Sequence, residues 1–355
     1  MPILRKGSRT SSCAAALLLL ASSSCSRSPS AEATTTSALG AAPSGIARTD
    51  TLVLDAASPS AGDAGDARDQ SRSAFAAGYL SALPAHGKSI GHTSVVFKLG
   101  LIGGLDAAYK PRSHRGGERF HGELAAFRLA VAWSLPNVPA AIPRSFPAEA
   151  LRGALDEKSD PLYDAEVIAE SDGTVRGALI PWIPKLEFLQ LESGAPRAQR
   201  ITWLDDIDAG APSPAACDAD LAAQISTMIL FDTMSGNWDR WSGGNIGVTR
   251  GANGACDRVL FIDNDGAFFD PIPAAPAANQ LALVKKMNRF SKSFVGSLRS
   301  VSEEALEKAI GDEAPGRPLL GRHVLDAFFA RRKTVLIAID QKIAANGEAA
   351  TLSLP

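Results

Sequence analysis

The pattern of apolar and polar positions divides the chain into a leading stretch without periodicity and a later part with regular periodicity. Across residues 26–72, Ser, Ala, Thr, Gly, Pro and Asp predominate, with one short apolar patch at 52–54. Such a stretch buries too little apolar surface to offset the entropy that ordering costs. We therefore expect a disordered, flexible tether over 26–72 and an ordered part that begins near Phe75.

The first half of the ordered part has the pattern of β-strands. TSVVFKL at 93–99 and LDAAYK at 105–110 are rich in β-forming residues, and the glycine-containing turn between them predicts a hairpin. Two more strands are predicted at 165–169 and 175–183, on either side of a turn that contains Gly173.

Helical spacing marks most of the remaining elements. GELAAFRLAVAWS at 122–134 places apolar residues on one helical face and stops before Pro136, which predicts one amphipathic helix within the β-rich half. A second helix is predicted from 218 to about 232, a short buried strand at 259–262, and several helices over 277–345. The expected fold class is α+β, with a β-rich first half followed by a mainly helical half.

Residues 1–25 have the order of a secretory signal peptide. Basic residues precede an apolar run at 14–21, and a serine-rich stretch then ends at Cys25. The run is shorter than the ~20 residues that a membrane span needs. Small residues before a cysteine also resemble a bacterial lipoprotein signal, in which Cys25 would carry a lipid anchor. Lipidation, ordinary cleavage and a free cysteine stay open, and the expected location is exported, either periplasmic or membrane-anchored as a lipoprotein.

Charge and cysteine content narrow the classes of partner. Removal of residues 1–25 leaves 33 basic against 38 acidic residues, a net charge of −5. A mildly acidic chain is poorly suited to nonspecific nucleic-acid binding, so no nucleic-acid partner is expected. Cys217 and Cys256 are the cysteines beyond Cys25. In an exported compartment they either pair as a disulfide or stay as two separately buried thiols.

Five polar residues at the ends of predicted elements suggest a chemistry. In chain order they are the strand-end Lys110, the helix-opening Glu123, Asp239 and Asn245 after a helix, and the strand-end Asp263. Phosphoryl transfer needs a cation on the phosphates, a carboxylate that fixes that cation, another that orients the attacking hydroxyl, and oxygen ligands for Mg²⁺ or Mn²⁺. Taken singly, a strand-end lysine is usually solvated and a first-turn glutamate usually complements the helix dipole. The order of all five therefore matters more than any one of them.

Four stretches carry a resemblance to a known group of proteins. They are YKPR at 109–112, GELAAFRLA at 122–130 with NVP at 137–139, FDTMSGNWDR at 231–240, and LFIDNDGAF at 260–268. Together they resemble the atypical protein-kinase-like superfamily, which includes the four-jointed-type secretory kinases, the HipA-like kinases and the bacterial phosphatidylinositol 3/4-kinase-like proteins. The resemblance implies a two-lobed kinase fold that binds ATP between a β-rich N-lobe at 73–186 and a helical C-lobe at 187–355.

The same resemblance implies roles for individual residues. Lys110 matches the phosphate-binding lysine, and Glu123 matches its partner on the helix. Asp239 matches the catalytic aspartate. Asn237 and Arg240 match motif residues that shape the loop and hold the catalytic aspartate.

The expected metal ligands depart from the usual pattern at two points. Asp263 matches the metal-binding aspartate of the Asp-Phe-Gly position, but the sequence here is Asp-Asn-Asp-Gly, so Asp265 could share or take over the metal contact. The metal-binding asparagine usually follows the catalytic aspartate by five positions, whereas Asn245 follows Asp239 by six. The pair Gly243-Gly244 can absorb the extra residue.

Two further stretches are candidates for nucleotide contact. Pro181, Trp182 and Ile183 lie between the two halves, where a kinase hinge would contact adenine through its backbone, and they also fit a rigid proline-bounded linker. Gly91 fits a turn whose backbone N–H groups approach phosphate, although an ordinary surface turn fits it equally. The nearby Gly87-Lys88-Ser89 is not a P-loop, because Ala82 stands where that motif requires glycine.

These features predict an exported ATP-dependent kinase that transfers the γ-phosphate to a hydroxyl of a protein, sugar or lipid, with Mg²⁺ or Mn²⁺ as cofactor. The alternative is a catalytically inactive pseudokinase, or binding module, that is tethered to the surface and keeps the nucleotide. ATP is scarce outside the bacterial cytoplasm. An exported kinase must therefore act on a host or a neighbouring cell or receive its nucleotide by another route, unless the signal is misread.

Overall fold

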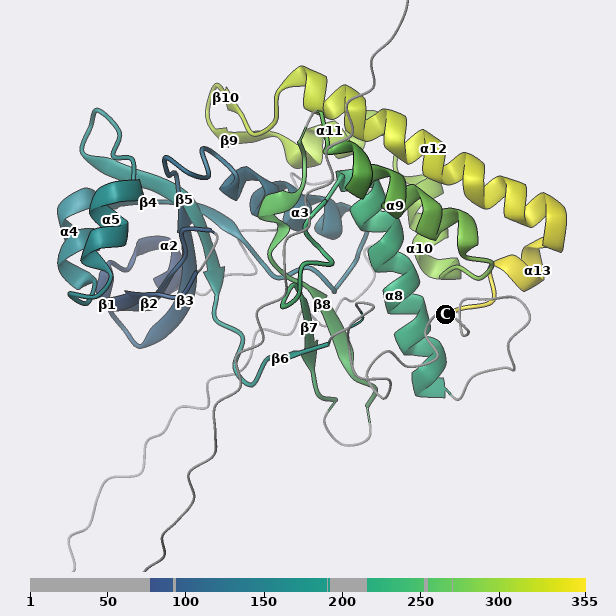
Figure 1. Ribbon diagram of the computed structural model, residues 1–355, viewed down its shortest axis with the longest axis horizontal. Coiled ribbons are helices and arrows are strands. Elements are labelled where there is room, and N and C mark those ends of the chain that lie inside the picture. Colours follow the sequence, from purple (N-terminus) through teal and green to yellow (C-terminus); the bar gives the residue numbers. More distant parts are fainter. Residues whose placement is uncertain (1–76, 92–93, 190, 192–215, 252–254, 270) are drawn as a thin grey trace, which may run out of the picture. The chain divides into compact units, whose positions relative to one another are not determined.

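The computed structural model describes residues 77–91, 94–189, 191, 216–251, 255–269 and 271–355. The predicted signal at 1–25, the predicted tether at 26–72 and the predicted start of order at Phe75 lie outside the described residues. Within them, a β-rich N-terminal region is followed by a mainly helical C-terminal region (Figure 1). The predicted α+β class is confirmed.

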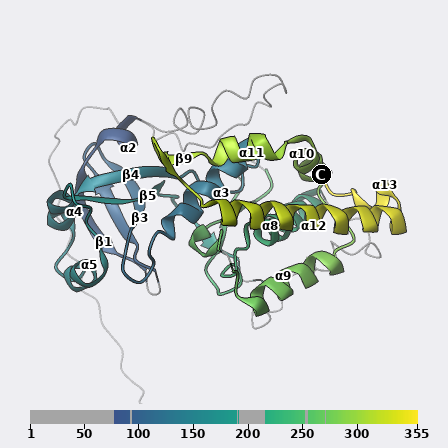
Figure 2. The ribbon, with the colours of Figure 1, turned by 90° about the horizontal axis from the view of Figure 1, so that it is seen from above.

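A five-stranded antiparallel sheet forms the N-terminal region, with strand order β1-β2-β3-β5-β4. Its strands are β1 (Pro84–Ser89), β2 (Phe97–Leu101), β3 (Leu105–Pro111), β4 (Ile142–Pro147) and β5 (Thr174–Pro181). The helices described in this region are α2 (Ala77–Ser81), α3 (Phe120–Ala132), α4 (Ala148–Ala154) and α5 (Asp160–Glu166). Helix α3 packs against β5, and α4 packs against β1 and β4 (Figure 1 and Figure 2).

The C-terminal region is built around α8 (Ala216–Ser235), which contacts α9, α12 and β8. The other helices are α9 (Ala274–Lys286), α10 (Lys292–Ser300), α11 (Glu303–Ile310), α12 (Arg322–Asn346), α13 (Glu348–Thr351) and the 3₁₀ turn η1 (Asn264–Gly266). A small antiparallel sheet joins β6 (Glu187–Phe188), β7 (Ile246–Thr249) and β8 (Arg258–Phe261), and β9 (Asp312–Ala314) pairs with β10 (Arg317–Pro318). None of the helices described combines the length and apolar character that crossing a bilayer requires.

The second half of α8 is buried on all sides. Residues 225–237 form an unbroken buried run, which explains why the sequence there lacks the charged outer face of a surface helix and holds Asp232 as its one charged residue. Directly after the helix, Gly236 has a φ of +69°, which residues with a side chain rarely adopt. The polar turn after α8 is therefore fixed to a rigid, buried helix.

The C-terminal end of α3 is embedded among helices of the C-terminal region. Trp133, directly after α3, packs edge-on against Phe231 of α8 and Phe294 of α10, with ring centroids 6.1 Å and 5.8 Å apart. Its ring also lies 6.2 Å from that of Phe328 in α12. Helix α3 belongs to the N-terminal region by sequence, but its end is held by the helical core.

Most of the predicted elements are confirmed. The hairpin is formed by β2 and β3, with Phe97 opposite Tyr109. The predicted helices at 122–134 and 218–232 are α3 and α8, and the predicted strand at 259–262 is β8.

The predicted strand at 165–169 is wrong. Residues Asp160–Glu166 form helix α5, and Pro161 fits its first turn. Val167, the next residue, makes an isolated bridge with Ser113 but no strand. Strands β1 and β4 were not predicted, because both contain prolines, which argue against a strand. These two strands form the edges of the sheet, where a missing N–H costs no ladder hydrogen bond.

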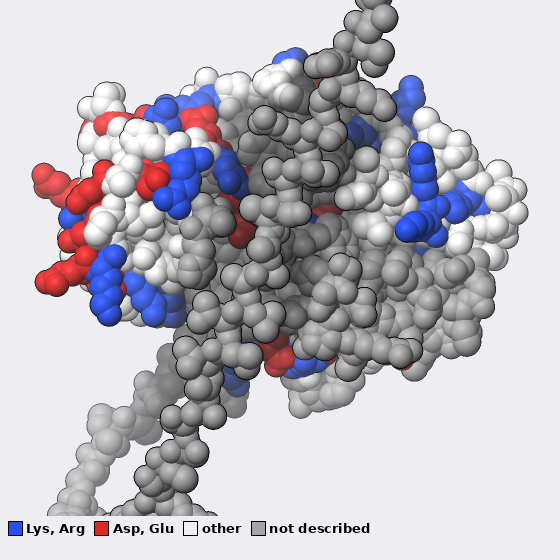
Figure 3. Space-filling model, in the orientation of Figure 1, with Lys and Arg blue, Asp and Glu red and all other residues white. Residues whose placement is uncertain are grey.

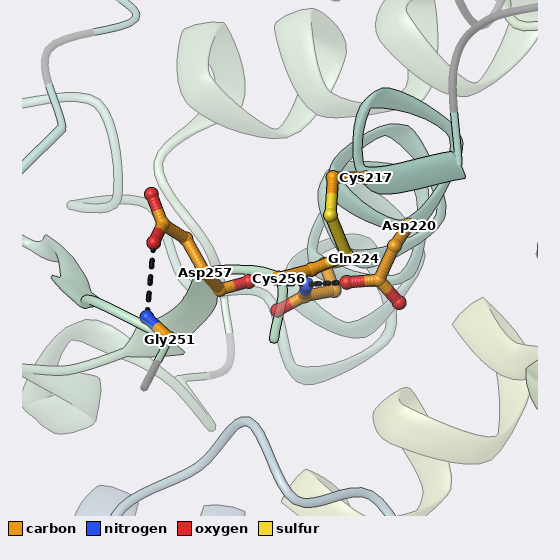
Figure 4. The surroundings of a disulfide bond; sticks show 6 residues. All are labelled: Cys217, Asp220, Gln224, Gly251, Cys256 and Asp257. Atoms are coloured by element: carbon orange, nitrogen blue, oxygen red, sulfur yellow. Dashed lines mark hydrogen bonds between the residues drawn. A yellow bond between two sulfur atoms is a disulfide. The ribbon is translucent and has the colours of Figure 1, made fainter. Parts of the chain in front are cut away.

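Cys217 and Cys256 form a disulfide, with Cα atoms 5.2 Å apart, so the pairing alternative holds. The bond joins the start of α8 to the connection between β7 and β8 (Figure 4). Beside it, Gln224 donates to the Asp220 carboxylate at 2.6 Å and to the Asp257 carbonyl at 3.0 Å. These contacts attach α8 to the small sheet at the end remote from the polar turn.

Acidic and basic side chains are interspersed over the part of the surface that carries α4 and α5 (Figure 3). Arg152 of α4, for example, pairs with both Asp160 and Asp164 of α5. Exposed pairs of this kind contribute little to stability.

Candidate active site

Lys110 and Glu123 form a buried ion pair between the sheet and α3. Lys110 is the penultimate residue of β3, and Glu123 lies in the first turn of α3. The lysine Nζ lies 2.5 Å from Glu123 Oε1, and the two residues are 7% and 4% exposed. The pair therefore fixes α3 relative to the strand.

The loop after β8 adds two more carboxylates to the same lysine. Lys110 Nζ lies 2.5 Å from Asp263 Oδ1 and 3.6 Å from Asp265 Oδ2. Asp263 has a left-handed backbone, with φ 55° and ψ 64°, a conformation that aspartate tolerates better than most residues. Its side chain is 33% exposed, whereas that of Asp265 is 4% exposed. Asp263 is thus the carboxylate of this loop that solvent or a ligand can reach.

The three carboxylates set the protonation states of the cluster. Burial disfavours the Lys110 ammonium, but Asp263, Glu123 and Asp265 outweigh this and raise its pKa above the usual value. Burial likewise opposes the charged form of Asp263, and Lys110 overcomes it and lowers the pKa. For Glu123, burial prevails over the attraction of Lys110 and raises the pKa. Lys110 is therefore a fixed cation.

Arg119, directly before α3, holds the second aspartate of the loop. Its Nη2 donates to Asp265 Oδ1 at 2.7 Å, and its Nε donates to the Asp265 carbonyl at 3.1 Å. The guanidinium lies 5.6 Å from the ring of Trp238 and 5.9 Å from that of Phe269. Both Asp265 carboxylate oxygens therefore face a cation of this chain.

Arg240, the residue after Asp239, is fully buried and makes several hydrogen bonds beneath the loop. Its guanidinium makes a two-pronged contact with Asp232 of α8, at 2.9 Å and 3.1 Å. It also donates to Asn264 Oδ1 at 2.7 Å, to the Asn245 carbonyl at 2.6 Å and to the Ile262 carbonyl. One side chain thereby joins α8 to the end of the Asp239 loop and to the start of the Asp263 loop.

Asp239 lies in the turn that Arg240 supports. Its backbone N–H donates to Asn237 Oδ1 at 3.2 Å, and its side chain is partly exposed. Burial raises the pKa of Asp239, and the charges of Asp263 and Asp265 raise it further against a hydrogen bond from Ser242. The aspartate is thus a better proton acceptor than an ordinary surface carboxylate.

Glycines allow the elements of the site to come this close. A Cβ on Gly266 would lie 2.9 Å from both Asn237 Oδ1 and Asp239 Cβ. A Cβ on Gly122 of α3 would lie 2.2 Å from the backbone oxygen of Asn264. The Asn264 N–H in turn donates to Glu123 Oε1 at 2.9 Å. Helix α3 therefore contacts the Asp263 loop directly through backbone.

Asn245 lies directly before β7 and is 6% exposed. Its amide nitrogen donates to the Asp239 carbonyl at 2.9 Å and to Ser242 Oγ at 3.2 Å. These bonds fix the amide so that its nitrogen faces the loop, and they leave the amide oxygen as its acceptor.

The cluster has an excess of negative charge. Four carboxylates, Glu123, Asp239, Asp263 and Asp265, face two cations, Lys110 and Arg119, which leaves two negative charges uncompensated. Oxygen donors with this excess suit Mg²⁺ or Mn²⁺. Within the described residues, no group of three or more His, Cys, Asp or Glu side chains is arranged as a ready-made metal cage. The donor set fits a divalent cation that phosphates help to hold.

Within the part of the chain that the structure describes, the stretches predicted to contact nucleotide make no hydrogen bond to this cluster. The Trp182 N–H donates to the Asp106 carbonyl at 2.9 Å, so it is already used, and its ring lies 4.3 Å from Lys98 Nζ. Pro181 has no N–H. Within the described residues the Ile183 N–H has no hydrogen-bond partner, so it is the free donor of this triplet. Gly91 lies between β1 and β2, where a Cβ would be 2.1 Å from the Ser94 oxygen.

The fold resembles those of solved kinase structures. One is the Golgi casein kinase, solved with Mn and ADP bound, which is 14% identical with a TM-score of 0.57 over 77% of this chain and 76% of that one. Another is a Fam20 protein from hydra, solved with sugar, which is 18% identical with a TM-score of 0.59 over 78% of this chain and 90% of that one. No protein-family model and no curated protein matches the sequence. The chain therefore shares the fold of these solved structures, as the predicted kinase-like fold required.

Three residues that support the site were not predicted from the sequence. Asp232 had a visible signal, because it is a carboxylate within an apolar helix and therefore needs a buried partner. Arg119 and Asn264 had none, because their importance depends on contacts between segments 146 and 141 residues apart.

Proposed function

We propose that this protein is a metal-dependent kinase that transfers the γ-phosphate of ATP to a hydroxyl group. The observation that carries the proposal is the contact of the Lys110 ammonium with Glu123 of α3 and with Asp263. Asp263 also interacts through its charge with Asp239, so all four residues belong to one cluster. A buried, permanently charged lysine is suited to hold phosphates. The fold supports the proposal, because a solved protein that shares it is named as a Golgi casein kinase and was solved with Mn and ADP bound.

Each residue has a part in the proposed transfer. Lys110 binds the phosphates, and Glu123 keeps it in place. Asp263 and the Asn245 amide oxygen hold the metal ion, which when bound neutralises charge on the phosphates. Asp239 orients the acceptor hydroxyl and takes its proton as the new P–O bond forms. The bond from the γ-phosphorus to the bridging oxygen breaks, and ADP leaves.

We do not assign Asp265 as a metal ligand, although its position in the sequence suggested that it could share the metal contact with Asp263. Both of its carboxylate oxygens face cations of the chain, Arg119 and Lys110. We therefore propose that Asp265 orders the loop and that Asn245 completes the metal shell with Asp263. Asn237 and Arg240 support the Asp239 loop from below.

The test is ATP turnover by the purified protein with Mn²⁺ or Mg²⁺, using protein, sugar and lipid acceptors. Wild type should release ADP faster than Asp239→Asn by about 10²-fold or more, since a positioned base typically contributes that much. If ADP release by wild type and by Asp239→Asn is the same as in buffer with every acceptor and both metals, the kinase proposal fails.

A second candidate is a nucleotide-binding pseudokinase or binding module. The specific observation in its favour is that the Asn245 amide nitrogen is bonded to the Asp239 backbone, in a loop one residue longer than usual. Thermal stabilisation by ATP with Mn²⁺ in the absence of turnover would identify this function. Loss of that stabilisation in Lys110→Met would locate the nucleotide.

We further propose that the protein works in an exported location, periplasmic or anchored to a membrane through a lipid on Cys25. The Cys217–Cys256 disulfide supports an oxidising compartment. Fractionation of cells that express the full chain tests the location, and a Cys25→Ser variant tests the anchor. A lipoprotein should move from the membrane to the soluble fraction on this substitution.

A further inference from the structure

Helix α3 has two functional faces. Successive helical residues are ~100° apart, so His121 lies about 200° around the helix from Glu123. Arg128, seven residues after His121, lies on the same side as His121. Glu123 faces Lys110, while His121 and Arg128 face the C-terminal segment 310–313, which links α11 to β9.

Glu313 of β9 joins three parts of the molecule. One of its oxygens, Oε2, accepts from Arg176 Nη1 of β5 at 2.5 Å and lies 3.2 Å from His121 Nε2 of α3. The Glu313 side chain is 5% exposed. The sheet, α3 and the C-terminal region therefore meet at a single carboxylate.

A second contact holds the same face of α3. Arg128, which is 4% exposed, donates from Nη1 to the Ile310 carbonyl and to the Asp312 carbonyl, the latter at 2.8 Å. These carbonyls belong to the end of α11 and the start of β9. Helix α11 also packs along α3, and both views show β9 beside α3 (Figure 1 and Figure 2).

We propose that segment 310–313 is an anchor that sets the position of α3, and that Glu313 is a positioning residue for the Lys110–Glu123 pair. Glu313 does not touch Lys110, Glu123 or either polar loop in any contact of the described residues. Glu313 acts by holding the side of α3 opposite Glu123. This contact fixes the rotation of α3 about its axis and its distance from the sheet, and so the position of Glu123 relative to Lys110. The consequence for nucleotide binding rests on the proposed function, whereas the consequence for α3 does not.

Removal of the Glu313 charge should loosen the anchor without unfolding the protein. Arg176 keeps two other carboxylates, Glu118 at 2.6 Å and Glu170 at 2.9 Å, so its buried charge stays paired. The Trp133 end of α3 also stays in the helical core. The N-terminal turns of α3, which carry Glu123, should be affected most.

The experiment compares Glu313→Gln with a matched control, Glu307→Gln. Glu307 lies on neighbouring α11 and pairs with Arg322 at the surface, where its side chain is 46% exposed. The first readout is hydrogen exchange of the α3 amides in the full protein without nucleotide. Exchange in the α3 amides should become about tenfold faster in Glu313→Gln and stay unchanged in Glu307→Gln and in α8, because local opening is governed by local contacts.

The second readout separates positioning from general stability. ADP affinity with Mn²⁺ is measured for Glu313→Gln, for Glu123→Gln and for the double variant. Glu313→Gln should weaken ADP by about 3- to 10-fold in the wild-type background and have no further effect in Glu123→Gln, since residues acting through one contact are not additive. Additive losses would overturn the proposal, because Glu313 would then act independently of Glu123.

The outcomes distinguish the anchor from the proposed function. Unchanged α3 exchange in Glu313→Gln overturns the anchor, whatever the nucleotide results. Faster exchange spread equally over α3 and α8 also overturns it, because the effect would be global. If wild type binds no ADP while α3 exchange is selectively faster in Glu313→Gln, the anchor stands and the kinase proposal fails.

Discussion

Arg240 donates a hydrogen bond to the side-chain oxygen of Asn264, at 2.7 Å, deep beneath the two polar loops of the site. Through this bond the loop that carries Asp239 and the loop that carries Asp263 share one guanidinium. The same guanidinium is neutralised by Asp232 from α8, and none of the three groups is more than 1% exposed. The relative position of the two loops is therefore set by buried charge and not by surface contacts.

Arg240→Gln should destabilise the protein by about 3–5 kcal/mol, because it leaves the Asp232 carboxylate buried without a partner. Chemical denaturation measures the loss. The matched control is Arg250→Gln, whose ion pairs with Glu187 and Asp257 lie at the surface and should contribute little to stability. The double variant Arg240→Gln with Asp232→Asn should recover part of the loss. Equal effects at positions 240 and 250 would contradict the stabilising role of the buried Arg240.

Gly122→Ala tests the close approach of α3 to the Asp263 loop. The added Cβ would lie 2.2 Å from the Asn264 backbone oxygen, which cannot rotate away, so helix and loop must separate. We expect a loss of about 1–3 kcal/mol in unfolding free energy, as is typical of overpacking.

Gly153→Ala in α4 is the control for helix propensity. A Cβ there meets nothing within 4 Å, so alanine should stabilise by about 0.5–1 kcal/mol. The two substitutions are chemically identical and should have opposite signs in the same denaturation experiment. A neutral or stabilising Gly122→Ala would show that α3 and the loop are not in backbone contact in solution.

The elements that sequence could predict are those whose local pattern agrees with their final environment. Lys110 lies near the end of a strand and Glu123 lies in the first turn of a helix, as expected, and the apolar stretch 228–231 of α8 is buried. Edge strands β1 and β4 were missed because their prolines are tolerated only by virtue of their place in the sheet. Residues 165–166 were misassigned because the start of α5, several residues earlier, determines their conformation.

The site shows the same limit. Motif order placed Lys110, Glu123 and Asp263 together, and they do meet at one ammonium group. Whether Asp265 or Asn245 is available as a ligand could not be derived from spacing, because it depends on Arg119, which comes from a different segment. Long-range pairing of a buried charge leaves no periodic trace in the sequence.

The Cys217–Cys256 disulfide should contribute about 2–4 kcal/mol to stability, chiefly by restricting the unfolded chain. The loop that it closes is 39 residues in sequence separation and includes the Asp239 turn and Asn245. The Cys217→Ser, Cys256→Ser double variant should therefore unfold at lower denaturant than wild type. Wild type in reducing conditions should match the double variant, while the double variant itself should not respond to reductant. A response of the double variant would mean that reductant acts elsewhere.

The Glu313 anchor predicts a pH-dependent contribution to stability. Burial opposes the charged form of Glu313, but hydrogen bonds from His121 and Arg176 prevail and lower its pKa below the usual value of 4.5. A carboxyl with a lowered folded-state pKa stabilises the fold when pH is above the unfolded-state pKa, and this stabilisation is lost as pH falls through the folded-state pKa. The contribution of Glu313 to the free energy of unfolding should therefore decrease as the pH falls.

Unfolding free energies of wild type and Glu313→Gln, measured in urea from pH 3 to pH 7, test this sign. The difference between the two proteins should shrink as pH falls below the usual pKa of the carboxyl, and vanish once the wild-type carboxyl is protonated in the folded state. The glutamine variant should have the flatter acid side, because it has no carboxyl to protonate at this position. Added salt should reduce the difference only slightly, since the side chain is 5% exposed and buried pairs are weakly screened. A difference that grew towards low pH would mean that Glu313 is held protonated in the fold and that Arg176 and His121 do not bind its charged form.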